Sequence, residues 1–320
     1  PRVRRQRQMC IRDSVGTGMV GMSFAYASLN QNLCDELVLI DINKERAIGE
    51  AMDLNHGLAF SNSSMKIYSG EYTHCSNADI VVICAGAPQK SGEKRPELLK
   101  KNTEVFKSIV APVCESGFKG IFLVATNPVD VMTRVTAKIS GFPKSRVFGT
   151  GTTLDSARLR YLLGDYFGIN PRSVHAYVMG EHGDTEFVPW SQALLSTKLV
   201  DDVLQDNPNT FKKRDIERIE AEVRNSAYKI IDAKGATYYG IGMAIVQICR
   251  AILQNENSVL TVSCCLNGCY NQEKIYAGTP AIINQSGVKS LIELSLTDTE
   301  MKKLQESCDA LEDYFKSIKM

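Results

Sequence analysis

A histidine between two glycines is the first residue of this sequence whose type and placement indicate catalysis. His182 lies in the segment Gly-Glu-His-Gly-Asp at residues 180–184, directly after an apolar stretch, and the chain has only four histidines. An imidazole titrates near neutral pH and can give or take a proton. Loop residues between glycines can also meet a ligand closely. His182 is therefore a candidate acid–base residue.

An acidic and a basic residue three positions apart form the second candidate group. Asp155 and Arg158 project from one face if residues 151–158 are helical. A planar guanidinium can then hold a carboxylate by two hydrogen bonds. The alternative interpretation is a surface salt bridge. Arg160 points about 200° around the same helix from Arg158, so it must serve a different environment.

Three glycines near the start of the chain match a dinucleotide-binding pattern. Gly16, Gly18 and Gly21 have the spacing G-x-G-x-x-G before a helical stretch, where bare backbone lets a pyrophosphate reach amide donors. The spacing alone is a weak indicator, but Asp41 ends the next apolar run, where a carboxylate can accept both ribose hydroxyls. Its charge would repel a 2′-phosphate, which favours NAD over NADP. The alternative role for Asp41 is a helix cap.

The elements that must position these residues follow an α/β pattern in the first half of the chain. Apolar runs at residues 37–40, 80–85 and 121–125 alternate with helical stretches, and each run is continuous, which is typical of parallel strands covered on both faces. After residue 149 the pattern becomes mixed. We expect a strand at 173–179, helices at 212–233 and 239–253, a hairpin at 258–275, and a closing helix at 297–318 capped by Thr297.

The size and charge of the chain limit its function. With 320 residues and 35.4 kDa, it exceeds one compact core, so we expect two lobes with a cleft between them. Lys and Arg number 37 against 36 Asp and Glu, which indicates neither a nucleic-acid nor a membrane partner. No apolar run reaches the roughly 18 residues of a membrane span, and no secretory signal is recognisable. The expected location is the cytoplasm.

Ten cysteines are scattered through apolar stretches of this long chain. Because this is not the framework of a small secreted domain, we interpret them as reduced thiols. Cys264, Cys265 and Cys269 form the one local cluster. A zinc site there would need a fourth ligand, and no nearby His or Cys provides it. We therefore expect no metal.

The first fourteen residues are anomalous. Four arginines lie within the first seven residues, and residues 9–14 have too few apolar side chains for the buried strand that should precede the glycine turn. The composition changes abruptly at Val15. An artefactual junction is the favoured explanation, and a truncated start or the tail of a targeting peptide are the alternatives. If the segment is authentic, the first strand is weak.

Five motifs in order carry a resemblance to a known enzyme family. They lie at residues 15–21, 85–90, 126–130, 155–158 and 180–184. They resemble those of the lactate/malate dehydrogenase family and, within it, the bacterial L-lactate dehydrogenases. The resemblance implies an α/β fold in which a Rossmann-type doubly wound parallel sheet at 15–149 binds NAD, followed by an α+β substrate and catalytic domain at 150–320.

The resemblance also implies a role for each residue of the catalytic group. His182 would protonate the substrate oxygen as hydride reaches the carbonyl carbon, while Asp155 orients the imidazole and raises its pKa. Arg158 would hold the substrate carboxylate by a fork that lysine cannot copy. Arg95, in a loop that closes over the substrate, would polarise the carbonyl.

Cofactor and substrate contacts are implied in the same way. Asn127 would contact the nicotinamide end of NAD and the substrate oxygen, Thr237 would line the substrate pocket, and the Asn127–Pro128 bond would be cis. Gln89 lies where similar malate dehydrogenases carry an arginine for the second carboxylate of oxaloacetate, which favours pyruvate. The expected cofactor contacts are Gly16, Gly18, Met19, Val20, Gly21, Asp41, Ala85, Gly86 and Asn127.

Regulation and assembly are further implications of the resemblance. Arg160 and His175 match positions at which similar bacterial enzymes bind fructose 1,6-bisphosphate between the subunits of a homotetramer. The implied activity is the reversible reduction of pyruvate to L-lactate by NADH. The alternatives are a related L-2-hydroxy acid or malate dehydrogenase and, of another class, a noncatalytic structural protein on a dehydrogenase scaffold. The complete catalytic group speaks against the last of these.

Overall fold

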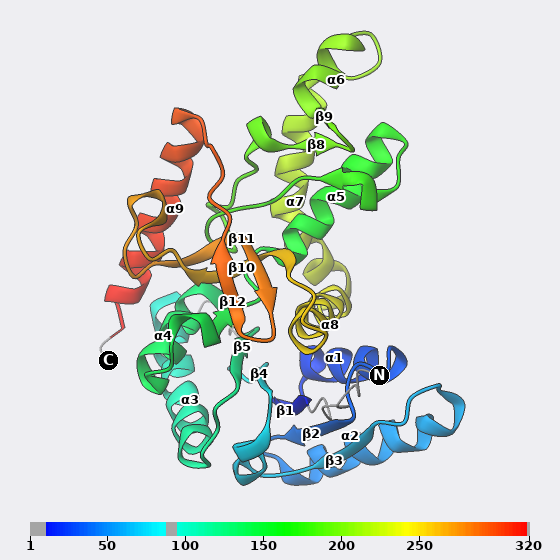
Figure 1. The fold of residues 1–320 in the computed structure, drawn as a ribbon, viewed down its shortest axis with the longest axis vertical. Coiled ribbons are helices and arrows are strands. Elements are labelled where there is room, and N and C mark those ends of the chain that lie inside the picture. Colours follow the sequence, from blue (N-terminus) through cyan, green and yellow to red (C-terminus); the bar gives the residue numbers. More distant parts are fainter. Residues whose placement is uncertain (1–10, 88–94, 319–320) are drawn as a thin grey trace, which may run out of the picture.

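One nine-stranded sheet runs through the lower and middle parts of the molecule as drawn in Figure 1. The structure is a computed structural model and describes residues 11–87 and 95–318. The strands are β1 (Ile11–Val15), β2 (Glu36–Ile40), β3 (Lys66–Ser69), β4 (Ile80–Ile83), β5 (Ile121–Val124), β6 (Val147–Gly149), β10 (Ser258–Cys265), β11 (Tyr276–Asn284) and β12 (Gly287–Leu291). Their order is β12-β11-β10-β6-β5-β4-β1-β2-β3, and β1 to β6 run parallel. Such sheets bind ligands at the carboxyl ends of the strands, where the order reverses between β1 and β4.

The continuous apolar runs are confirmed as strands covered on both faces. In β2, Leu37 and Leu39 point into one core, and Val38 and Ile40 point into another. The pattern does not alternate because neither face meets water. The first core includes residues of α1 (Met19–Asn30), α2 (Lys44–Gly57) and α8 (Tyr239–Leu253), and the second includes residues of α3 (Arg95–Glu115), α4 (Val129–Ser140) and α9 (Asp298–Lys316).

A third core holds together the lobe at the top of Figure 1. Leu159 and Leu163 of α5 (Thr153–Phe167) pack there with Ile216 and Ile219 of α7 (Lys213–Lys234). A small antiparallel sheet of β7 (Val174–His175), β8 (Leu194–Leu195) and β9 (Lys198–Leu199) completes the lobe, followed by the short α6 (Val200–Asp206). Because α5 starts directly after β6, the lobe is fixed to the end of the parallel sheet.

The helices expected in the second half of the chain are confirmed. The ends of α7 differ by one residue from the expected 212–233, and α8 spans the expected 239–253. Thr297 caps α9, since its hydroxyl accepts a hydrogen bond of 3.3 Å from the backbone of Glu300. The Glu300 carboxylate in turn accepts a hydrogen bond of 2.9 Å from the N–H of Thr297, which completes a capping box.

Two expected β elements of the second half are wrong in extent. The hairpin is formed by β10 and β11, so its second strand begins only at Tyr276 and residues 266–275 form the connection. The strand expected at 173–179 is limited to β7. The chain leaves the small sheet there and pairs instead at Met179 with Phe187 and at Gly180 with Gly278. Gly278 is distant from Gly180 in the sequence, so this pairing carries no local signal.

The first strand begins earlier than the expected start of the domain. β1 starts at Ile11 and pairs with β2 and β4, so residues 11–14 belong to the sheet. Its pairing with β4 shifts register between Ile11 and Ser14, in the stretch where the sequence is least like a buried strand. The remainder of the anomalous head, residues 1–10, lies outside the described part.

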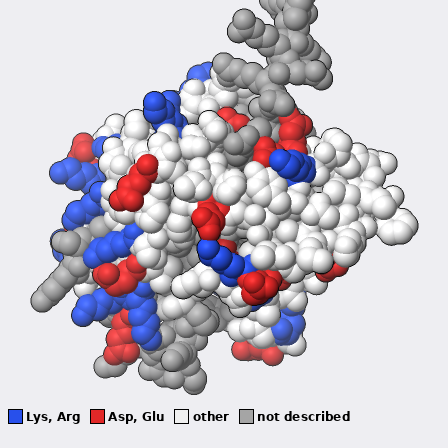
Figure 2. All heavy atoms as spheres, turned by 90° about the horizontal axis from the view of Figure 1, so that it is seen from below, with Lys and Arg blue, Asp and Glu red and all other residues white. Residues whose placement is uncertain are grey.

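The surface carries both signs of charge. On the face drawn in Figure 2, Lys and Arg are interspersed with Asp and Glu, and no broad area of a single sign is visible. None of the helices in residues 11–87 and 95–318 combines the length and apolar character needed to cross a membrane. The nine cysteines of these ranges are free thiols, and Cys264 and Cys265 are buried in β10.

Candidate active site

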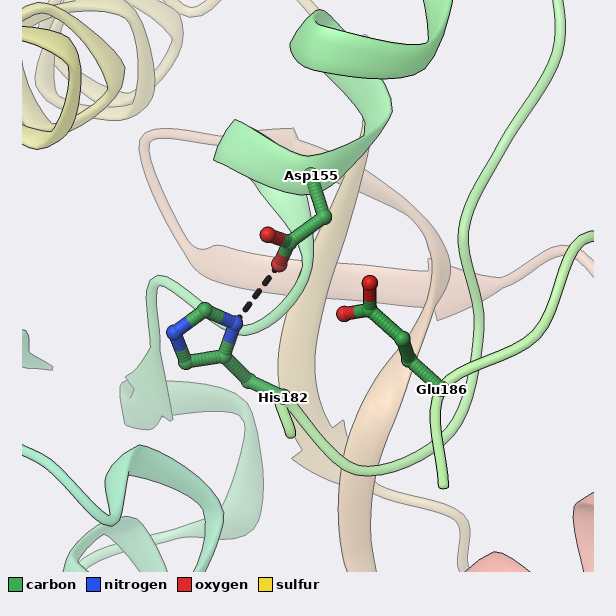
Figure 3. Close-up of side chains that lie close together, drawn as sticks. All are labelled: Asp155, His182 and Glu186. Carbon is green, nitrogen blue, oxygen red and sulfur yellow. Dashed lines mark hydrogen bonds and ion pairs between the residues drawn. The ribbon is translucent and has the colours of Figure 1, made fainter. Parts of the chain in front are cut away.

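Buried Asp155 pairs with half-buried His182 (Figure 3), and Arg158 also contacts this carboxylate. Asp155 comes from the first turn of α5, and His182 comes from the loop after Met179. His182 Nδ1 lies 2.6 Å from Asp155 Oδ2, and Arg158 Nη1 donates a hydrogen bond of 2.7 Å to Asp155 Oδ1. The structure therefore brings the three sequence-derived candidates into direct contact, with Asp155 only 1% exposed.

The charges of this group determine its protonation. Burial alone would lower the pKa of His182, but the Asp155 carboxylate, with smaller contributions from Glu186 and Asp130, raises it to about 9. Burial would raise the pKa of Asp155, but His182 and Arg158 hold it below its usual value. The pair therefore carries an imidazolium and a carboxylate at neutral pH.

A second carboxylate fixes the backbone of the histidine loop. The N–H of His182 donates a hydrogen bond of 2.8 Å to Asp130 Oδ2. Asp130 lies in the first turn of α4, directly after the Asn127–Pro128 bond, which is cis. Burial raises the pKa of Asp130 to about 6. Because α4 starts at the carboxyl end of β5, this bond ties the histidine loop to the crevice of the parallel sheet.

A third carboxyl group, Glu186, lies beside the pair and was not singled out in the sequence. Asp155, His182 and Glu186 each place one ligand atom within 4.8 Å of the others. Histidine and carboxylates also bind zinc. Here, however, His182 Nδ1 and both oxygens of Asp155 are already engaged within the protein. We therefore interpret Asp155, His182 and Glu186 as a cluster of interacting titratable groups rather than as a zinc site.

The glycine turn has the geometry that a dinucleotide needs. A Cβ on Gly16 would lie 2.6 Å from Ala85 N, and a Cβ on Gly21 would lie 2.0 Å from Gly16 O, whereas a Cβ on Gly18 would meet no atom within 4 Å. Among the described residues no side chain caps α1, so they leave its N-terminal backbone open, as a pyrophosphate site requires. The other expected contacts of this turn begin the same helix, namely Met19 and Val20.

Asp41 lies at the end of β2 and is bound to the glycine turn. Its Oδ2 accepts hydrogen bonds from the N–H and the hydroxyl of Thr17 at 2.7 and 2.9 Å, and its Oδ1 accepts one from Asn43 N at 2.9 Å. Burial would raise the pKa of Asp41, but these bonds lower it overall. The helix-cap interpretation of Asp41 is wrong, because Asn43 caps α2 by accepting from Arg46 N.

Asn102 of α3 joins the loops that follow β4 and β5. Its Oδ1 accepts a hydrogen bond of 2.8 Å from Ala87 N, and its Nδ2 donates one of 3.1 Å to Asn127 O. The expected cofactor contacts Ala85, Gly86 and Asn127 therefore lie in adjacent loops at the carboxyl edge of the sheet. Asn102 was not singled out in the sequence.

Three expected substrate residues have no described contact with the catalytic pair. Thr237 lies half-buried between α7 and α8. In the described part of the chain it makes no hydrogen bond with His182. Gln89 lies outside the described residues. Arg95 begins α3, but its side chain is likewise outside the described part.

The two expected effector residues lie on the upper lobe. The Nε of Arg160 donates a hydrogen bond of 3.2 Å to the backbone oxygen of Ala176, the neighbour of His175 in sequence. Its guanidinium lies 5.2 Å from the ring centroid of Tyr177, and burial lowers its pKa. His175 is exposed in β7. As expected, Arg160 serves an environment different from that of Arg158.

Comparisons with known proteins agree with this geometry. Residues 14–149 match the lactate/malate dehydrogenase NAD binding domain, and residues 152–320 match the lactate/malate dehydrogenase alpha/beta C-terminal domain. The chain is 52% identical over 309 residues to an L-lactate dehydrogenase of Geobacillus sp. (strain WCH70), a match that covers 95% of this chain and 97% of the relative. It is 53% identical over 299 residues to L-lactate dehydrogenase 2 of Bacillus cereus (strain ATCC 10987), covering 93% and 95%.

Solved structures show the same fold over nearly the full length. A lactate dehydrogenase from a Medee basin deep-sea metagenome library superposes with a TM-score of 0.93 at 50% identity, covering 96% of this chain and 98% of the other. The minor L-lactate dehydrogenase of Enterococcus mundtii in its ligands-bound form gives a TM-score of 0.94 at 44% identity, covering 97% and 98%. This chain, with its NAD-binding domain, belongs to the lactate/malate dehydrogenase family.

Proposed function

We propose that this chain is an L-lactate dehydrogenase, which reduces pyruvate to L-lactate with NADH and catalyses the reverse reaction. The observation that carries the proposal is the Asp155–His182 pair, which adjoins Arg158 and is tied through Asp130 to the carboxyl ends of the parallel strands. The names of the relatives and solved neighbours support the same activity.

The histidine pair accounts for the proton that the reaction needs. Bound NADH supplies the hydride for the carbonyl carbon. His182 gives its proton to the substrate oxygen from Nε2, because its Nδ1 faces Asp155. With a pKa of about 9, His182 carries that proton at neutral pH. In the reverse direction, neutral His182 accepts the proton of the hydroxyl group.

The remaining residues bind and orient the substrate. Arg158 holds the substrate carboxylate, and its own position is fixed by Asp155. Arg95 polarises the carbonyl group, Asn127 contacts the nicotinamide end of NAD and the substrate oxygen, and Thr237 forms part of the pocket wall. These assignments rest on the resemblance, supported for Asn127 by its place at the carboxyl edge of the sheet.

Gln89 determines the choice of substrate in this proposal. A neutral amide leaves the second carboxylate of oxaloacetate without a partner, which costs several kcal/mol in a dry pocket. Gln89→Arg is expected to raise kcat/KM for oxaloacetate relative to pyruvate. An unchanged ratio would remove Gln89 from the proposal.

The oxidation of NADH with pyruvate, oxaloacetate and 2-oxoisocaproate tests the function directly. We expect the highest kcat/KM with pyruvate and a loss of about 10²–10⁴-fold in His182→Asn. Preference for oxaloacetate would favour a malate dehydrogenase, and preference for 2-oxoisocaproate another L-2-hydroxy acid dehydrogenase. A folded chain that oxidises NADH with none of the three would favour the noncatalytic structural alternative.

Organisation, regulation and location complete the proposal. We place the NAD-binding domain at 15–149 and the substrate domain at 150–320, which the two family matches support. The protein forms a homotetramer in the cytoplasm, where its free thiols stay reduced. Fructose 1,6-bisphosphate binds at Arg160 and His175 between subunits, which the proximity of Arg160 to β7 supports.

A further inference from the structure

Glu186 is a buried carboxyl group that no step of the proposed reaction uses. It is 5% exposed, and its side chain points from the histidine loop toward Asp155 and His182 (Figure 3). Among the described residues, none donates a hydrogen bond to its carboxyl oxygens. Glu181 of the same loop differs, because its Oε2 accepts a hydrogen bond of 2.6 Å from the hydroxyl of Thr185.

Charged side chains from three parts of the chain lie near Glu186. Asp155 and Arg158 face it from α5, His182 from its own loop, and Arg224 from α7. Arg224 also donates a hydrogen bond of 3.0 Å to the backbone oxygen of Glu186. Burial and the charge of Asp155 raise the pKa of Glu186 to about 8, although His182, Arg224 and Arg158 act in the opposite direction. The side chain is therefore mostly neutral at pH 7.

An anionic substrate changes this balance. Its carboxylate, bound at Arg158, adds a negative charge close to Asp155 and Glu186 and uses the guanidinium that would otherwise stabilise an ionised Glu186. Like charges in a buried site disfavour ionisation. Substrate binding and the protonation of Glu186 are therefore linked, and each must favour the other.

We propose that Glu186 is a positioning residue that must be protonated for a 2-oxo acid to bind beside Asp155, His182 and Arg158. The proton comes from solvent and is additional to the one on His182. At pH values above both pKa values, substrate binding then takes up two protons, one at each residue. This inference rests on the proposed function for the identity of the bound anion.

The test measures the affinity of the NADH-loaded enzyme for oxamate, an unreactive analogue of pyruvate, from pH 6 to pH 10. For the wild type, the slope of log Kd against pH is expected to approach two at the alkaline end. Glu186→Gln keeps the shape of the side chain but cannot ionise, so its slope is expected to approach one. When each Kd is divided by its own value at pH 6.5, the variant is expected to bind oxamate about thirtyfold more tightly than the wild type at pH 9.5.

Glu181→Gln is the matched control, since it replaces another buried glutamate of the same loop and should keep the wild-type slope. A wild-type slope of one would overturn the proposal, even if Glu186→Gln failed to fold. A slope of two that persists in folded Glu186→Gln would also overturn it. A purely structural role would change affinity or melting temperature without changing the slope. If the wild type neither binds oxamate nor oxidises NADH with pyruvate at pH 7, the proposed function fails, and the inference fails with it.

Discussion

At the level of single residues, the Asp155–His182 contact determines the pH range of the site. Asp155→Asn removes the charge that raises the pKa of His182, while burial, which lowers it, remains. The pKa of His182 is then expected to fall from about 9 toward the usual value of about 6.5, because only the smaller contributions of Glu186 and Asp130 still raise it. Binding of 2-oxo acids needs the imidazolium, so it is lost as the pH rises through this lower value.

The measurement for Asp155→Asn is kcat/KM for pyruvate between pH 5 and pH 10. We expect a loss of about 10²–10⁴-fold at pH 7 and an alkaline limb displaced downward by about two pH units. Asp165→Asn, at an exposed position of the same helix, is the control and should match the wild type. An alkaline limb that is not displaced in Asp155→Asn would show that this carboxylate does not set the pKa of the histidine.

Arg158 supports a second prediction, which concerns geometry rather than charge. Arg158→Lys keeps the positive charge but removes the planar fork. Charge-assisted hydrogen bonds contribute about 1.5–3 kcal/mol each, so KM for pyruvate is expected to rise by about 10–100-fold. Arg218→Lys, exposed on α7, should leave KM unchanged. A normal KM in Arg158→Lys would mean that another residue binds the carboxylate.

The residues of the site differ in how far the sequence could predict them. His182, Asp155 and Arg158 lie in short motifs with informative neighbours, so they could be singled out as candidates, and the structure brings them together. Asp130 lies within a recognised motif, but its role depends on a bond to His182 across 52 residues. Glu186 lies just beyond a motif and is defined by burial and by its distance to Asp155. Such properties arise only when distant segments pack together.

At the level of elements, the turn between β1 and α1 allows a test of cofactor binding. A Cβ fits sterically at both Gly18 and Gly49, since neither position has an atom within 4 Å. Only Gly18 lies at the N-terminus of α1, where the pyrophosphate is expected. Gly18→Ala should leave the melting temperature nearly unchanged but weaken NADH binding by about 10–100-fold through lost hydrogen bonds to a charged group.

Gly49→Ala is the matched control for this turn. It lies inside α2, where alanine stabilises a helix by up to about 1 kcal/mol relative to glycine. Its NADH affinity should equal that of the wild type. Fluorescence titration with NADH and thermal unfolding of both variants supply the comparison. Equal affinities in Gly18→Ala and the wild type would place the pyrophosphate elsewhere.

The sequence predicted elements well where burial or capping is local. Residues 37–40 of β2 and all residues of β4 and β5 are apolar because both faces are covered, and α9 is marked by its capping box. The strand expected at 173–179 failed because Met179 and Gly180 pair with Phe187 and Gly278 instead of extending β7. Tertiary pairing overrides local preference there. The hairpin was misplaced because the mostly polar residues 267–274 form its connection, and the second strand is the apolar run that follows them.

At the level of the whole molecule, the two halves of the chain share one sheet rather than meeting only at a cleft. Ser263 of β10 pairs with Gly149 of β6, so the antiparallel strands of the second half extend the parallel sheet of the first. The histidine loop is bound from both sides, through Asp130 of α4 and through the bridge between Gly180 and Gly278 of β11. The upper lobe contributes Asp155 and Arg158 of α5 to this site, and Arg224 of α7 bonds to the backbone oxygen of Glu186.

That arrangement gives a prediction for regulation. Arg160 and Asp155 lie on the same helix α5, so an anion bound at Arg160 and His175 can act on the position of the catalytic pair. Fructose 1,6-bisphosphate is expected to lower the half-saturating pyruvate concentration and to favour the tetramer, since a ligand between subunits stabilises their association. Arg160→Gln should abolish both effects while Arg218→Gln keeps them. Steady-state kinetics and light scattering, each with and without the effector, are the measurements. A response that survives in both Arg160→Gln and His175→Asn would show that the effector binds elsewhere.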